Sequence, residues 1–532
     1  MRAAPYVLYL AICLIILPST SDGFPTADGV AYISIAENWA AGRFDLAVNG
    51  FWSPLLSFLL VPAELVGAPM FLSGQIIMIA TGALTVLQMK RLMRALNYDT
   101  LSDDILLLGA VPLIAYAALS LLTPDLLMAT LLLGYLSTMI DQRSMKPARR
   151  GIIAGCWAGA AFLAKAYALP FVVAHLVITV LVRVIRRGDL GQRWIVATVT
   201  ALTVAVFVVP WATMLSIKYD RPTIATTAGY HVSITSSGAS GNAFGWAGIL
   251  EPTNEYAVSA WEDPSLLPGE DARPSPSSTN DVGAVSSEDD SGGSTDPWTA
   301  LENRTRRAIG SLRVATIAGG LMGLTGVVGT LSMVWWLISR RPRRPVRAAA
   351  PDPFVDIVLA VVVYVGGLSL LVMETRYLWA PLLLTVPCAA WGLRRFRQHV
   401  PRVAFRTATA FVAASTIFGP AIGIARVAEK AGEQERAVVA LDDVLRPGDR
   451  IVTSRSALSF MPGLCLVDEC QYWGAERSES AAEIGRRLDE NAIDTYIAMK
   501  GDEPGSGCEV FSGELLGRDL VVHDRTCDEV GR

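Results

Sequence analysis

The sequence predicts an α-helical protein that crosses a membrane about eleven times and ends in a small α/β domain. First, 52% of its 532 residues are hydrophobic and only 18% are charged, with a mean hydropathy of +0.41, which is too apolar for a soluble protein of this length. Second, apolar runs of spanning length recur along the chain. Third, Lys and Arg gather between these runs, as in polytopic membrane proteins.

Eleven apolar runs are candidate spans, because a helix that crosses a hydrocarbon core of about 30 Å needs about 20 apolar residues, or somewhat fewer in a thin bilayer. They lie near residues 5–20, 70–89, 104–122, 124–140, 151–164, 166–182, 194–216, 311–338, 353–373, 376–393 and 403–424. If every run crosses, the basic clusters all fall on one side: Arg2, Lys90–Arg94, Arg143–Arg150, Arg183–Arg193, Arg340–Arg347 and Arg394–Arg402. The N-terminus is therefore expected in the cytoplasm and the C-terminal domain outside.

Two of these assignments have alternatives. Residues 151–182 would extend about 48 Å as one helix, longer than the hydrocarbon core, and one flanking Arg cluster would then lie outside. We therefore predict two short spans, with Lys165 at the outer turn and Pro170 just beyond it. The first run, MRAAPYVLYLAICLIILPST, is also compatible with a cleaved signal peptide. Asp28 lies outside in both cases.

Three long segments are expected on the outer side, at residues 21–69, 217–308 and 425–532. The first contains an amphipathic helix that Gly42 would stop, and we expect it to lie along the membrane interface with Trp39 at headgroup level. The apolar face of this helix is formed by Tyr32, Ile35, Ala36 and Trp39. In the second segment, residues 262–297 are rich in Ser, Pro, Gly and acidic residues and are predicted to be disordered.

Residues 425–532 are predicted to form a small exoplasmic α/β domain, following a transmembrane domain of residues 1–424. Helix-like and strand-like segments alternate in it, at residues 433–445, 450–454, 464–468, 480–493, 494–500 and 519–524. No nucleotide-binding or metal-binding motif is present, so the domain is interpreted as an accessory. It carries four of the seven cysteines, an even set that indicates two disulfides in an oxidising compartment, with three possible connectivities; free or buried thiols are the alternative.

Five ionisable residues lie at the outer face of the predicted bundle, and charged groups at membrane depth are costly enough to suggest a function. Asp28 follows the first span, Asp125 begins the fourth, Lys165 is at an outer turn, and Glu374 and Arg376 separate the ninth and tenth spans. The inner Arg clusters alone determine this topology, so it does not depend on the five residues that it brings to one face. This convergence is the strongest functional signal in the sequence.

Each of these residues also has an ordinary structural explanation. Asp28 would cap the helix that follows it, and Asp125, after a proline, would favour the positive end of a helix dipole. Lys165 would extend to the interface, and Glu374 and Arg376 would pair in a tight turn. Three further residues are better explained as a loop histidine or as satisfied groups inside the bundle: His231, His175 and Asp356.

Two outward carboxylates and two outward cations beside a bilayer suit sugar transfer from a polyprenyl phosphate. A general base takes the proton from the acceptor hydroxyl, and cations stabilise the departing phosphate. Lys supplies a point charge and Arg a fork of donors that matches phosphate oxygens. Because the leaving group is a lipid phosphate rather than a nucleoside diphosphate, this chemistry requires no cofactor, and a divalent metal is compatible but not indicated.

The segment DGVAYISIAENWAAGRFDLAVNGFWSPLLSFLLVP resembles the first outer loop of the GT-C glycosyltransferases, integral membrane enzymes that use polyprenyl-phosphate sugars. The resemblance covers about residues 1–425 and implies that Asp28 is the catalytic base. It also matches a second acidic residue to Asp125 in TPDLL, a lysine to Lys165 in GAAFLAKAYALPF, and Arg376-Tyr377 in ETRYLWAP. Several relatives carry an acidic residue or His before the loop proline, where this chain reads NGFWSPL, so no metal site is expected there.

The sequence therefore predicts an inverting glycosyltransferase of the plasma (inner) membrane with an exoplasmic active site. Asp28 would be the base and Asp125 would assist in positioning, while the substrate-binding residues would be Lys165, Arg376, Tyr377, Tyr32, Trp52 and His231. The partners would be the lipid donor, the bilayer and a glycan, lipid or protein acceptor. Nucleic acid is excluded, since no basic stripe interleaved with aromatics exists. A transporter or lipid flippase is the alternative, although no inverted repeat with midplane charges is apparent. A receptor would not need eleven spans.

Overall fold

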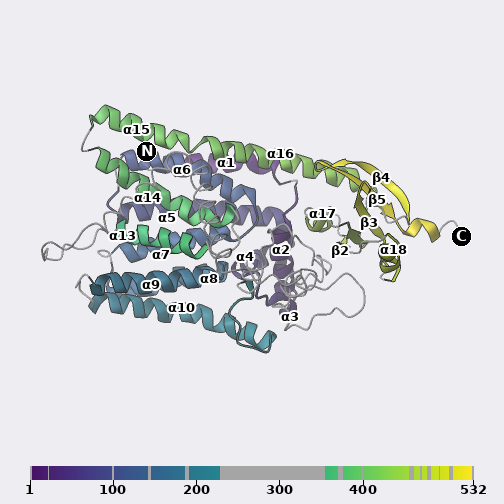
Figure 1. Ribbon diagram of the computed structural model, residues 1–532, viewed down its shortest axis with the longest axis horizontal. Helices are drawn as coiled ribbons and strands as arrows, with labels where there is room; N and C mark the ends of the chain where they lie inside the picture. The colour runs from purple at the N-terminus through teal and green to yellow at the C-terminus, as the bar shows by residue number, and fades with distance from the viewer. Residues whose placement is uncertain are drawn as a thin grey trace, which may run out of the picture.

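The computed structural model describes thirteen stretches of the chain: residues 3–21, 23–98, 101–141, 145–185, 191–227, 354–368, 375–397, 400–454, 461–467, 470–475, 481–490, 492–501 and 507–529. A bundle of helices with roughly aligned axes forms one part, and a small sheet with two helices lies at one end of it (Figure 1). The bundle helices are α1 (Ala4–Ile16), α5 (Met70–Ala95), α6 (Leu101–Ser120), α7 (Asp125–Ile140), α8 (Pro147–Ala164), α9 (Ala168–Ile185), α10 (Gly191–Lys218), α13 (Phe354–Leu368), α14 (Trp379–Phe396), α15 (Arg402–Ser415) and α16 (Phe418–Leu441).

Four stretches of this bundle are long and apolar enough to cross a membrane, at Met70–Ala95, Asp103–Ser120, Trp194–Lys218 and Arg402–Leu441. Shorter apolar helices occur at Ala4–Ser19, Leu55–Leu65, Asp125–Ile140, Ala168–Leu181 and Phe354–Leu368. These counts refer to the described stretches alone, and the expected span at 311–338 lies outside them. The protein is therefore a helical membrane protein, while the total of eleven spans stays a prediction.

The long apolar stretch 151–182 forms two helices rather than one. Helix α8 ends at Ala164, Lys165 has an extended backbone (φ −157°, ψ 126°), and α9 begins at Ala168. Pro170 lies in the first turn of α9, where its missing N–H breaks no helical hydrogen bond. The prediction of two helices with Lys165 at their junction is thus confirmed.

Helix α8 packs closely on α10 through three glycines spaced four residues apart, Gly151, Gly155 and Gly159. A Cβ atom on any of them would come closer than 3.0 Å to a side chain of α10. Small residues at this spacing let two helix backbones approach each other, which is the usual basis of tight packing in membranes. Lys165 therefore extends from a rigid helix pair.

Helix α2 (Ala27–Ala40) runs across the end of the bundle, followed by α3 (Phe44–Ala47) and α4 (Leu55–Leu65). The expectation of an amphipathic helix with one apolar face was wrong for α2, because Ile33, Ser34 and Asn38, on its other faces, are as buried as Tyr32 and Ile35. Helices α3 and α4 pack against α2, and Tyr32, Ile33, Ile35 and Ala36 belong to the hydrophobic core of the bundle. Asp28 therefore lies on an enclosed element rather than on a surface helix.

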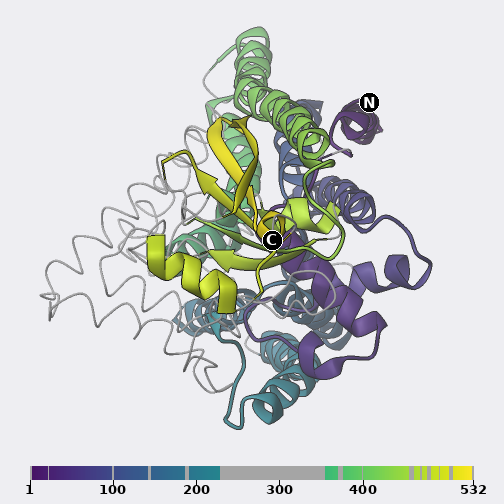
Figure 2. The same cartoon turned by 90° about the vertical axis from the view of Figure 1, so that its right-hand side faces the viewer.

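The C-terminal part is a five-stranded sheet of order β2-β1-β3-β5-β4. Its elements are β1 (Arg450–Thr453), α17 (Met461–Val467), β2 (Gln471–Ala475), α18 (Ala481–Glu490), β3 (Thr495–Met499), β4 (Cys508–Leu515) and β5 (Arg518–Asp524). Strands β1, β2 and β3 are parallel, while β5 is antiparallel to β3 and to β4. Figure 2 shows this sheet in front of the end of the bundle.

Three details of this part differ from the sequence prediction. The run 464–468, expected as a strand, lies mostly in helix α17, and the strand is the following β2. Strand β4 was not anticipated. Helix α16 continues from the bundle into the C-terminal part, so it crosses the expected boundary between residues 424 and 425 without a break. Two disulfides are present, as expected, and they join neighbours in sequence: Cys465 to Cys470 and Cys508 to Cys527.

Candidate active site

Four of the five charged residues that the sequence indicated meet at the end of the bundle. Asp28 is the second residue of α2, Asp125 begins α7, Lys165 joins α8 to α9, and Arg376 lies in the short 3-10 helix η4 (Thr375–Leu378). Lys165 Nζ donates to Asp125 Oδ1, and Arg376 Nη1 donates to Asp28 Oδ2. Arg376 Nε also lies 3.9 Å from Asp125 Oδ2, which links the two pairs. We call these four residues the charge cluster.

Exposure separates the two carboxylates of the charge cluster. The Asp125 side chain is only 1% exposed, whereas those of Asp28, Arg376 and Lys165 are 15%, 16% and 27% exposed. Solvent therefore reaches the Asp28 carboxylate, whereas the Asp125 carboxylate is buried against Lys165 and close to Arg376.

The helix-end explanations account for these positions only in part. The cap of α2 is Thr26, and Asp28 is in the first turn with its carboxylate on Arg376. Asp125 does occupy the first position of α7, where the dipole favours a carboxylate, but it also pairs with Lys165. The ion pairs, rather than the helix ends, hold these side chains in place.

Two tyrosines border the charge cluster. The Tyr377 ring lies 4.1 Å from Lys165 Nζ and 5.4 Å from the Arg376 guanidinium carbon, so its face contributes to holding both cations. Burial, together with the charges of Asp28 and Asp125, raises the pKa of Tyr32 well above its usual range. Tyr32 therefore keeps its proton and is available as a hydrogen-bond donor beside the carboxylates.

The structure does not bring the other expected site residues to the charge cluster: Trp52 lies in the core of the bundle, and His231 is not among the described residues. Trp52 is 3% exposed and packs against Phe51 at a ring separation of 4.8 Å, so it belongs to the core of the bundle. His231 and Glu374 lie outside the described residues. Among the residues that the structure does describe, no group of three or more His, Cys, Asp or Glu side chains is arranged to hold a metal ion.

The sequence analysis did not identify the residues that hydrogen-bond to the backbone beside Lys165 and Arg376. Ser53 Oγ accepts a hydrogen bond from the Ala166 amide at 3.1 Å, directly after Lys165. Tyr364 of α13 donates its hydroxyl to the Tyr377 carbonyl at 3.1 Å, next to Arg376, and Tyr167 donates to the Tyr364 carbonyl at 2.7 Å. A tyrosine inside an apolar run was the available signal, since a buried hydroxyl needs a partner.

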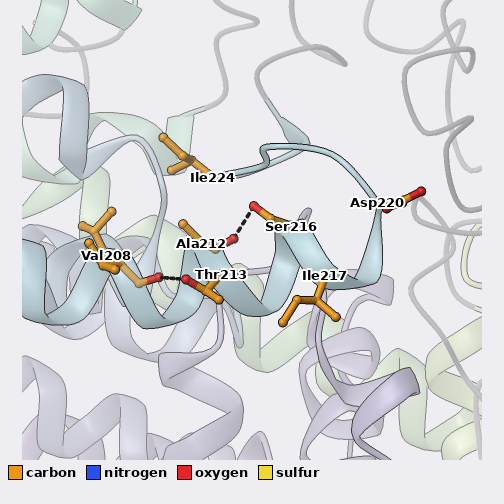
Figure 3. Close-up of a pocket in the computed structure, with 8 residues that line it drawn as sticks. Val208, Ala212, Thr213, Ser216, Ile217, Asp220 and Ile224 are labelled. Carbon is orange, nitrogen blue, oxygen red and sulfur yellow. Dashed lines mark hydrogen bonds between the residues drawn. The ribbon is translucent and has the colours of Figure 1, made fainter.

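A separate groove of about 650 Å³ lies beside the last turns of α10 (Figure 3). It is lined by Val208, Val209, Ala212, Thr213, Ser216, Ile217, Asp220 and Ile224. Ile217 is 77% exposed and Ile224 is 51% exposed, and none of the lining residues belongs to the charge cluster. This apolar, open groove is distinct from the candidate active site.

Comparisons with known proteins agree with the fold. No protein-family model matches the sequence, and no curated protein matches it. Two crystal structures of ArnT from Cupriavidus metallidurans, one in the apo state and one bound to undecaprenyl phosphate, are similar with TM-scores of 0.56 and 0.55, at 13% identity and with 98% of each chain covered. The Archaeoglobus fulgidus oligosaccharyltransferase in the apo form is similar with a TM-score of 0.53 at 11% identity, covering 92% of this chain and 69% of that one. The resemblance to GT-C glycosyltransferases is therefore confirmed at the level of the fold.

Proposed function

We propose that this chain, which has the GT-C fold, is an inverting glycosyltransferase that moves a sugar from a polyprenyl phosphate to an acceptor on the exoplasmic face. The observation that carries the proposal is the charge cluster, in which four segments far apart in sequence bring two carboxylates and two cations together. A purely structural pair would not need the accessibility that Asp28 and Lys165 retain.

The two cations receive the phosphate of the donor lipid. Lys165 has three N–H donors, and the bond to Asp125 Oδ1 uses one of them. Arg376 presents a planar fork that suits phosphate oxygens. In a site shielded from water, these charges stabilise the negative charge that develops on the leaving phosphate more strongly than they would in water.

Arrival of the phosphate also activates the base. Arg376 pairs with Asp28, and a lipid phosphate that binds the guanidinium competes with that carboxylate. The carboxylate released in this way accepts the proton of the acceptor hydroxyl. The acceptor oxygen then bonds to the anomeric carbon, and the bond from that carbon to the phosphate oxygen breaks with its electrons on the phosphate. One such displacement inverts the anomeric configuration.

Two further observations support the donor class and the side of the membrane. The similar ArnT structure was solved with undecaprenyl phosphate, a polyprenyl phosphate of the kind that the charge cluster suits. The two disulfides of the C-terminal part fit an oxidising compartment. With the N-terminus in the cytoplasm, as the basic clusters predict, the active site and this domain face outward in the plasma (inner) membrane.

The test is transfer of labelled sugar from a panel of hexosyl and pentosyl polyprenyl phosphates by membranes that contain the protein. Asp28→Asn should lower transfer by about 100-fold or more, to a slow residual rate, while the donor still binds. The matched control is Asp45→Asn, an exposed carboxylate of helix α3 in the same outer segment, which should transfer like the wild type. Normal transfer by Asp28→Asn would assign the base to another group. If the wild-type protein turns over none of the donors, the transporter or flippase is favoured instead.

A further inference from the structure

The first outer segment inserts into the core of the C-terminal part, just before Asp28. Phe24 is 3% exposed and packs among residues of α16, α17 and the sheet. Its neighbours in that core include Ala437, Leu441, Met461, Leu464 and Ile497. The Phe24 amide also donates to Gln434 Oε1 of α16 at 3.4 Å. Figure 1 shows α17 next to α2, which agrees with this insertion.

Two glycines make the contact close. A Cβ atom on Gly463 of α17 would come closer than 3.0 Å to the Pro25 carbonyl oxygen and the Phe24 ring. On the opposite side, a Cβ atom on Gly23 would lie 2.6 Å from Gln434 Oε1. Residues 23–25 are thus held between α16 and α17. A larger residue at Gly463 would have to displace the Pro25 backbone or the Phe24 ring, whereas one at Gly23 would have to displace the end of the Gln434 side chain.

We call residues 23–25 and the parts of α16 and α17 that hold them the clamp, and its contacts extend to the first turn of α2. A Cβ atom on Gly29 would meet Pro25 Cβ at 2.8 Å and Leu122 Cβ at 3.2 Å, so the turn that contains Asp28 rests on Pro25 on one side and on Leu122 on the other. Leu122 lies in the short connection before α7 and Asp125. A shift of Pro25 would therefore move the Asp28 carboxylate relative to the rest of the charge cluster.

A disulfide holds the other side of the clamp. Cys465, in α17, is bonded to Cys470, directly before β2, and both are fully buried in the same core as Phe24. Helix α17 has only seven residues, too few for stability on its own. The disulfide and the sheet give it the rigidity that a clamp needs.

We propose that the C-terminal part is a positioning element of the active site, in which Gly463 and Phe24 fix Pro25 and so aim Asp28 at the acceptor. This inference rests on the proposed function, because it requires Asp28 to be the base. It assigns a catalytic contribution to a domain whose sequence indicates only an accessory. Gly463 and Phe24 are positioning residues, and they act only through the placement of Asp28.

The test compares Gly463→Ala with Gly432→Ala, a matched change in α16 where a Cβ atom meets only the tip of Arg436 at 3.8 Å. A displacement of about 1 Å at a reacting group can cost about 100-fold in rate, so Gly463→Ala should lower kcat by about 10- to 100-fold. Donor binding, measured with the sugar-linked lipid in detergent, should change by less than about two-fold, because Asp125 and Tyr377, which lie outside residues 23–25 and α17, also hold Lys165 and Arg376. Gly432→Ala should match the wild type.

A double-mutant cycle separates positioning from a general loss of structure. In an Asp28→Asn background, Gly463→Ala should have no further effect on the residual slow transfer, because the group that it displaces is already inactive. A merely structural defect would lower that residual rate by the same factor again, which would overturn the inference. If Gly463→Ala does not fold, Phe24→Leu, which removes ring contacts without adding an atom against the backbone, goes through the same cycle.

The outcomes distinguish this inference from the proposed function. Wild-type transfer by Asp28→Asn would refute the base assignment, and the inference would fail with it. A strong loss of transfer in Asp28→Asn together with normal kcat in Gly463→Ala and Phe24→Leu would overturn the inference alone. An equal fall of kcat in Gly432→Ala would do the same, since it would show that any added methyl on these helices is harmful.

Discussion

Replacing Lys165 by Met should strip Asp125 of its main partner. Asp125 is 1% exposed, and its second oxygen then has Arg376 Nε at 3.9 Å as its remaining cation. Removing one partner of a buried ion pair costs about 3–5 kcal/mol, because the other charge stays buried and uncompensated. Since Arg376 remains nearby, we expect Lys165→Met to lower the free energy of unfolding by about 3 kcal/mol, at the lower end of that range.

The assay is reversible unfolding in mixed detergent micelles, applied to a double-mutant cycle. Asp125→Asn in combination with Lys165→Met removes the buried charge as well, so the double variant should lie within about 1 kcal/mol of the wild type, with a coupling energy of about 2 kcal/mol or more. The matched control is Lys430→Met, an exposed lysine of α16, which should change stability by less than about 0.5 kcal/mol.

Two results would refute this reasoning. One is a Lys165→Met variant that unfolds like the control, which would mean that Asp125 is solvated or fully satisfied by Arg376. The other is a double variant as unstable as the sum of the two single changes, which would mean that Asp125 and Lys165 do not interact. In either case the charge cluster would not be the low-dielectric site that the proposed chemistry needs.

Three further predictions concern other parts of the chain. Burial and the neighbouring Glu64 carboxylate raise the pKa of Glu37 to about 7 from its ordinary 4.5, so between these two pH values the folded state holds a proton that the unfolded chain has lost. Stability should therefore fall as pH rises from about 4.5 to about 7 and level off above that. Glu37→Gln should flatten this fall in the melting temperature, and an unchanged slope would contradict the prediction. Gly155→Ala should lower the melting temperature because the added Cβ atom collides with α10. The control is Gly366→Ala, whose Cβ atom meets nothing within 4 Å and should leave the melting temperature unchanged. Equal melting temperatures of the two variants would contradict the close packing of α8 on α10. Peptide mapping without reductant should recover Cys508 joined to Cys527, and any other linkage contradicts the structure.

The sequence predicted where most of the candidate site residues lie along the helices. Charges inside a bilayer are costly, so Arg clusters mark the inner side and leave few places for Asp125 and Lys165. The break at Lys165 followed from length and from the two flanking Arg clusters, because a single helix would be too long for the hydrocarbon core and would leave one cluster outside. These signals are local in sequence, and the structure confirms the break, while the number of spans and the side of the membrane stay predictions.

What could not be predicted depends on contacts between distant segments. Asp28 pairs with Arg376 across 348 positions of sequence, and no local pattern indicates which carboxylate takes which cation. The second buried face of α2 exists only because other elements cover Ser34 and Asn38. The short apolar run that became α17 had no periodicity to separate helix from strand. The sequence predicted two disulfides but not which cysteine joins Cys465, and it gave no sign of the contact between α17 and Phe24.

The most direct test of the central claim, that Asp28 acts as a base in a single displacement, is the anomeric configuration of the product. A polyprenyl-phosphate sugar of defined configuration is supplied to the protein, and the new glycosidic bond is assigned by NMR. The account predicts inversion, with no sugar covalently attached to the protein at any time during turnover. Retention of configuration, or a sugar trapped on Asp28, would contradict it, because the carboxylate would then be the nucleophile rather than the base.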